Sequence, residues 1–136
     1  MVDKYQRMVL VIRHQNSHFR DIVTGFRDFC KQYPIDYFVV NEIKSFEIKP
    51  ADTFIVVDDR DLEFLVRYSI DKKMVLGTNL GIISYNETPL KGIIATGITT
   101  ISTDFAQMGK SMAEMVLSGK REKIDNPFIM HVRNSF

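Results

Sequence analysis

Two short polar segments of this sequence carry side chains suited to ligand binding, and each directly follows an apolar run. Asp58-Asp59-Arg60-Asp61 follows the apolar residues 53–57, and Asn86-Glu87 follows an isoleucine-rich run. Carboxylate and amide groups in such places form hydrogen bonds with the paired hydroxyls of a small polar ligand. We therefore predict that the first residue of each segment, Asp58 and Asn86, contacts a ligand.

The other members of these segments suit structural positions. Asp59 or Asp61 is expected to cap the helix that follows, because a carboxylate is favourable at a helix amino terminus. Glu87 precedes Thr88-Pro89, which is typical of a turn that ends a strand. Neither segment is part of a serine-based catalytic motif or a glycine-rich phosphate loop.

Two further polar positions follow apolar runs. His14 and Asn16 lie in a polar loop after residues 8–12, and Thr103 follows the β-branched run at 98–102. In open α/β sheets the residues just past the carboxyl ends of the strands face the ligand crevice. We therefore expect these residues on the same side of the molecule as Asp58 and Asn86.

Strands and helices alternate along the chain. Strands are predicted at 8–12, 37–40, 53–57, from residue 82, and at 98–102, with a final apolar run at 128–133. Apolar residues at three- and four-residue spacing predict helices at 19–33, 62–73 and 105–117, whereas 43–52 is expected to be a loop or one irregular turn. This alternation predicts an α/β fold, a doubly wound and mainly parallel sheet with helices on both faces, in which residues 1–136 form a single domain.

Composition excludes several classes of function. The 136 residues are 45% hydrophobic with a formal net charge of +1, and no run of basic residues marks a nucleic-acid surface. One cysteine, Cys30, and three histidines without metal-ligand spacing argue against a metal site, and we expect no cofactor. Neither a membrane span nor a secretory signal is expected, so the predicted location is cytoplasmic.

Two alternatives use the acidic residues differently. A receiver- or flavodoxin-like signalling domain would place a phosphoacceptor or magnesium site at Asp58 or Asp59, yet the first strand ends in Arg13 without an acid. Thr103 also stands where receivers carry a lysine. A small enzyme would use Asp58 and Glu87 as acid and base, which needs a perturbed carboxyl pKa in a closed pocket.

Several segments, in order, resemble the effector-binding region of LacI/GalR-type transcription regulators. Residues 82–88, I-I-S-Y-N-E-T, are similar to the family's V-V-G-Y/F-D-D strand end, and residues 98–101 to its L-T-T-I/V strand. Residues 108–113 resemble its L-G-x-x-A helix, residues 131–135 its closing V-V-R-E-S, and Gly25-Phe26 part of its first helix. The sequence of residues 82–105 also resembles that of regulators that carry a GntR-type winged helix at the amino terminus.

The resemblance implies site residues one position at a time. Asp58 matches a ligand-contacting Asn/Asp, Asn86 a ligand-contacting Asp, and Thr103 and Phe105 fall where the family's chain passes the hinge beside the ligand. Ile22 stands where the family has a sugar-binding arginine, so His14, Asn16 or Arg20 would have to supply that donor.

The family also implies a fold and partners. The expected fold is a Rossmann-like, periplasmic-binding-protein-like subdomain that contacts a sugar-like effector. DNA would be bound only through an amino-terminal domain outside these residues, together with a first sensor subdomain. A homodimer is expected, and the methionine-rich face of residues 105–117 is expected to lack its intramolecular partner and to mediate self-association.

Overall fold

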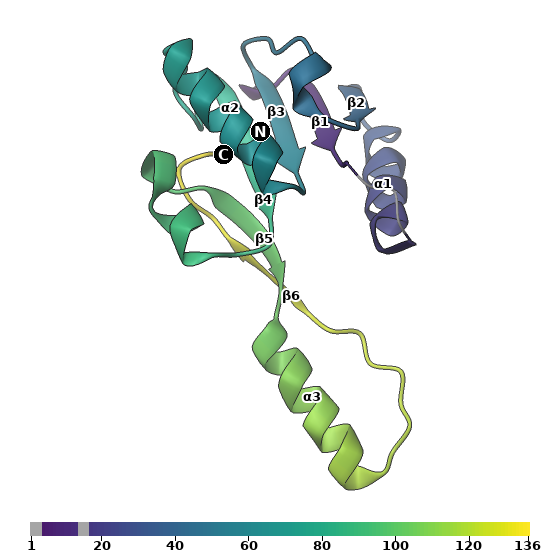
Figure 1. The fold of residues 1–136 in the computed structure, drawn as a ribbon. Helices are drawn as coiled ribbons and strands as arrows, with labels where there is room; N and C mark the ends of the chain where they lie inside the picture. Colours follow the sequence, from purple (N-terminus) through teal and green to yellow (C-terminus); the bar gives the residue numbers. More distant parts are fainter. Residues whose placement is uncertain (1–3, 14–16) are drawn as a thin grey trace.

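A six-stranded sheet with the strand order β2-β1-β3-β4-β5-β6 organises the molecule (Figure 1). The first five strands pair in parallel, and β6 pairs with β5 in antiparallel orientation. The computed structural model describes residues 4–13 and 17–136. The strands are β1 (Arg7–Val11), β2 (Asp36–Val40), β3 (Asp52–Val56), β4 (Leu80–Tyr85), β5 (Thr99–Thr103) and β6 (Phe128–His131).

Two helices cover opposite faces of the sheet. On one face α1 (Ser17–Cys30) places Val23 against Leu10 and Ile12 of the first strand segment. On the other face α2 (Asp59–Asp71) places Leu62 and Leu65 in the larger core with alternate residues of β1, β3 and β4. Because successive side chains of a strand point to opposite faces, this division confirms the predicted doubly wound α/β architecture with helices on both faces.

The short elements sit where the sequence predicted irregular structure. The connection between β2 and β3 contains one 3-10 turn, η2 (Ile43–Ser45), as expected for residues 43–52. Two further 3-10 turns, η3 (Pro89–Gly92) and η4 (Ile94–Thr96), join β4 to β5. The first helix ends at Cys30, three residues earlier than predicted, because residues 31–34 form a turn before β2.

Helix α3 (Phe105–Ser118) projects away from the sheet (Figure 1). None of its residues is buried, and Met112 and Val116 are 62% and 81% exposed. The residues 119–127, which return the chain to β6, run beside it and contribute Ile124 to hollows along its methionines. The apolar side of α3 therefore has little covering within the described part of the chain.

Candidate functional site

A polar hollow of about 350 Å³ opens at the carboxyl ends of β3 and β4, which are neighbours in the sheet. The helix α2 begins at its rim, so strand ends and a helix amino terminus meet there. It is lined by Phe19, Val57, Asp58, Asp59, Tyr85, Asn86 and Lys91. The hollow therefore brings together the two predicted ligand contacts, Asp58 and Asn86.

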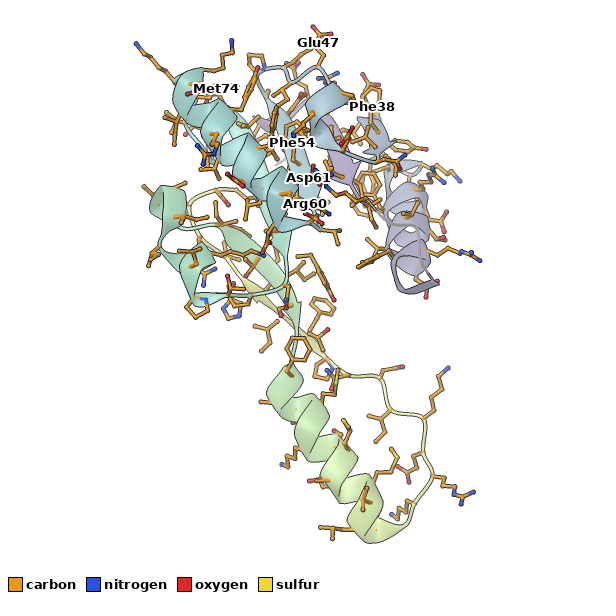
Figure 2. All side chains as sticks on the ribbon, in the orientation of Figure 1. Phe38, Glu47, Phe54, Arg60, Asp61 and Met74 are labelled. Atoms are coloured by element: carbon orange, nitrogen blue, oxygen red, sulfur yellow. The ribbon has the colours of Figure 1, made fainter. Side chains whose placement is uncertain are left out.

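Asp58 is the amino-terminal cap of α2, and its carboxylate is held by Arg60. One oxygen, Oδ1, accepts from the Arg60 backbone N–H at 2.9 Å and from Nε at 2.8 Å, while Oδ2 accepts from Nη2 at 2.8 Å. These side-chain hydrogen bonds lower the pKa of Asp58 well below its ordinary range, so the carboxylate is ionised at neutral pH. Figure 2 shows Arg60 and Asp61 at the start of this helix.

The prediction that Asp59 or Asp61 caps α2 is wrong. Asp61 is fully buried, and its two oxygens accept from Arg13 Nε at 2.9 Å and Nη2 at 3.0 Å. It also accepts from the Ile43 backbone N–H at 3.1 Å. The cap falls to Asp58 because its extended backbone (φ −101, ψ 134) aims the carboxylate at the first helical N–H groups.

Asn86 directly follows β4 and lies in the left-handed backbone region with φ 71. Its N–H donates to the Ile101 carbonyl at 2.8 Å, and its Oδ1 accepts from the Ser102 hydroxyl at 3.3 Å. Among residues 4–13 and 17–136 nothing accepts a hydrogen bond from Asn86 Nδ2. This amide therefore has donors to offer a ligand in the hollow.

Glu87 is engaged by the segment that follows β6. Arg133 donates from Nη1 to Oε2 at 3.0 Å and from Nη2 to Oε1 at 2.6 Å, and the Thr100 hydroxyl also donates to Oε2. The Arg133 hydrogen bonds are the main cause that lowers the pKa of Glu87 to about 2. A carboxyl group that acts as a general acid at neutral pH needs a raised pKa, so neither Glu87 nor Asp58 suits that part of the enzyme alternative.

The remaining predicted site residues lie elsewhere. Thr103 ends β5 and pairs with Phe128, and Phe105 begins α3 with 60% of its surface exposed. Neither lines the hollow. His14 and Asn16 lie outside the described residues.

Three groups at the hollow were not foreseen from the sequence. Phe19 and Tyr85 form an edge-to-face aromatic pair with ring centroids 6.3 Å apart, and the buried Lys91 also lines the hollow. Ile22, the departure from the family's sugar-binding arginine, packs against the core instead. Arg60 does not line the hollow, but its guanidinium holds the Asp58 carboxylate that does.

The two connections between α3 and the sheet run side by side. Asp104 donates its N–H to the Pro127 carbonyl at 3.0 Å, and Asn126 Nδ2 donates to the Asp104 carbonyl at 3.0 Å. These bonds continue the pairing of β5 with β6 by one residue beyond the sheet. The paired segments form a narrow double-stranded link.

Some classes of site have no support in the described residues. Within residues 4–13 and 17–136 no three His, Cys, Asp or Glu side chains are grouped so that they could hold a metal ion. In the same part of the chain no helix has the length and apolar character needed to cross a membrane.

Comparisons with known proteins identify the fold. No family model matches the sequence, and no curated protein matches it. Among solved structures, the Lac repressor bound to ONPG in the repressed state has a TM-score of 0.75 at 14% identity, covering 99% of this chain and 47% of that one. The transcriptional regulator CelR in complex with cellobiose has a TM-score of 0.72 at 11% identity, covering 98% and 48%.

A third structure extends this likeness to another source. A LacI-family repressor structure from Corynebacterium glutamicum, described as putative in its own name, has a TM-score of 0.66 at 17% identity, covering 96% of this chain and 57% of that one. The chain spans about half the length of the solved chains that it matches. At these identities the likeness shows a shared fold, periplasmic-binding-protein-like and mainly parallel.

Proposed function

We propose that this chain is an effector-sensing subdomain of a LacI/GalR-type transcription regulator, and that it binds a small polar ligand of the sugar class in the polar hollow. The observation that carries the proposal is the meeting of Asp58 and Asn86 at neighbouring strand ends, on a fold shared with sugar-binding repressors. Binding without chemistry is proposed, because the carboxyl groups near the hollow are stabilised in their ionised form.

The hollow suits a polyhydroxylated ring. Asp58 Oδ2 accepts one hydrogen bond, from Arg60 Nη2, and so keeps a lone pair for a ligand hydroxyl. Asn86 Nδ2 supplies a donor. The edge-to-face pair of Phe19 and Tyr85 provides an apolar wall for the carbon face of the ring.

The paired link at Asp104 and Pro127 is the proposed hinge. A ligand that contacts both the hollow and the sensor subdomain outside these residues would hold the two subdomains closed around it. Binding would then shift the population from an open to a closed state. Thr103 and Phe105 flank this link, so we propose for them a hinge position and contact with the ligand only on closure.

The regulator's partners are also proposals. DNA would be contacted by another domain, whether a GntR-type winged helix or another kind, because the net charge here is +1. We propose a homodimer, with exposed apolar residues of α3 such as Met112 and Val116 contributing to association. A cytoplasmic location follows from DNA as the target.

A ligand screen tests the binding proposal. Monosaccharides, disaccharides such as cellobiose, and sugar phosphates are added to the chain, and the midpoint of thermal unfolding is recorded. A binding sugar should raise the midpoint for the wild type and not for Asp58→Ala, while Asp71→Ala, an exposed aspartate at the far end of α2, should respond like the wild type. An equal response of all three proteins would place binding outside the hollow.

The receiver alternative makes a different prediction. A phosphoacceptor would be phosphorylated by acetyl phosphate in the presence of magnesium, whereas the Asp58 carboxylate is paired with the Arg60 guanidinium through both oxygens. We expect no phosphorylated species by mass spectrometry. A phosphate adduct on Asp58 or Asp59 would favour the signalling domain instead.

A further inference from the structure

Lys91 is a buried lysine whose ammonium group joins three parts of the fold. The residue is 3% exposed, and its Nζ lies 2.9 Å from the Tyr85 carbonyl, 2.9 Å from the Asn86 carbonyl and 2.8 Å from Asp59 Oδ1. The two carbonyls accept hydrogen bonds from the ammonium group, and the Asp59 carboxylate forms an ion pair with it. A charge can remain on so buried a side chain because it is paired with a carboxylate and hydrogen-bonded to two carbonyls.

The turn that Lys91 holds has a left-handed backbone conformation. Asn86 adopts φ 71, a region that asparagine enters more readily than most residues with a side chain. Its N–H is bound by β5 and its side-chain oxygen by Ser102, while its carbonyl is bound by Lys91. Lys91 thus makes one of the three attachments that fix the direction of the Asn86 amide.

Lys91 and Asp59 also separate two hollows. One is the polar hollow, and the other is a largely apolar groove of about 490 Å³ between α2 and the η3–η4 segment. Asp59 and Lys91 are the residues that line both. Their ion pair is therefore a wall between the polar hollow and the groove, and it ties the start of α2 to the end of β4.

We propose that Lys91 is a positioning residue of the ligand site, which holds Asn86 and the first turn of α2 in the geometry that binds the ligand. This rests on the proposed function. Because its ammonium group already contacts two carbonyls and one carboxylate of the protein, Lys91 acts on the ligand through Asn86 and Asp59. The ligand therefore needs no anionic group to pair with this cation, which favours a neutral polyhydroxyl compound at this end of the hollow.

Amide hydrogen exchange tests the positioning without any ligand. In Lys91→Met we expect the Asn86 amide to exchange at least about tenfold faster relative to the amide of Leu10 in the central strand. Lys44→Met, at an exposed lysine, is the matched control and should leave the ratio unchanged. Equal acceleration at Asn86 and Leu10 would mean a general loss of stability and would overturn the proposal, as would no change at Asn86.

A second variant guards against misfolding of Lys91→Met. Asp59→Asn keeps the ammonium over the two carbonyls and weakens its tie to α2, so we expect a smaller but local acceleration at Asn86. An unchanged ratio in this variant would overturn the part of the proposal that assigns Asp59 to the tie.

The ligand is tested separately with cellobiose as the probe. If cellobiose binds the wild type, Lys91→Met should weaken binding by about tenfold or more, and Lys44→Met should not. Equal affinities would overturn the positioning role even if exchange had changed. If no sugar binds the wild type, the proposed function fails, while the exchange result still decides whether Lys91 fixes the turn.

Discussion

Arg60 and Asp58 form a two-pronged ion pair within one helical turn, with Nε and Nη2 each 2.8 Å from a different carboxylate oxygen. The same carboxylate caps α2 through the Arg60 backbone N–H. One aspartate therefore starts the helix, fixes a guanidinium and lines the polar hollow. The capping role and the proposed ligand contact involve the same side chain, so its removal should affect both stability and binding.

Asp58→Ala should lower the free energy of unfolding by about 1 kcal/mol, because the helix loses its amino-terminal cap. Urea denaturation of this variant and of Asp71→Ala, which caps nothing, measures the difference. A loss confined to ligand binding, with stability equal to that of Asp71→Ala, would contradict the capping role.

Asp61→Ala should destabilise the fold more strongly, by about 3 kcal/mol, because it leaves Arg13 without its buried partner. Asp61 is fully buried and is bound by both Arg13 and the Ile43 backbone. Denaturation midpoints of Asp61→Ala and Asp58→Ala give the comparison. A smaller loss of unfolding free energy for Asp61→Ala than for Asp58→Ala would show that water or other groups replace Asp61 around Arg13.

Asp61 illustrates which features of the fold could be predicted from the sequence and which could not. Apolar periodicity predicted the five parallel strands and the three α-helices, although α1 ends three residues before its predicted end. The antiparallel pairing of β6 with β5 was not predicted. Residues 58–61 lie where the strand gives way to the helix α2. The sequence alone does not show which of their side chains faces the core. Lys91 was not predicted as part of the site because its hydrogen-bond acceptors are backbone carbonyls, which have no sequence signature.

Acid should weaken the link between the β4 turn and the segment after β6. The pKa of Glu87 is lowered from 4.5 to about 2 by Arg133, so the folded protein resists protonation more than the unfolded chain does. The stability from Glu87 is therefore present above pH 4.5 and is lost as the pH falls toward 2. Thermal midpoints across this range should fall less steeply for Glu87→Gln. Parallel curves for both proteins would refute the assignment.

Two glycines should respond to alanine in opposite ways. Gly77 has φ +79, and an added Cβ would lie 1.9 Å from the Asn134 carbonyl oxygen, so Gly77→Ala should cost more than about 1–2 kcal/mol. Gly25 lies in α1 with nothing near its Cβ position, so Gly25→Ala should stabilise by about 0.5–1 kcal/mol. Denaturant midpoints decide both signs. A neutral Gly77→Ala would mean that the terminal segment around Asn134 is easily displaced.

The central claim is that a sugar-class ligand binds at the carboxyl ends of β3 and β4. Its most direct test is amide chemical-shift mapping by NMR as the sugar that raises the unfolding midpoint is added. The account predicts saturable shifts concentrated at residues 57–60 and 85–87, with little change along α3. Shifts centred instead on the apolar groove beside α2, or on the aromatic hollow near Tyr5 and Phe136, would contradict it.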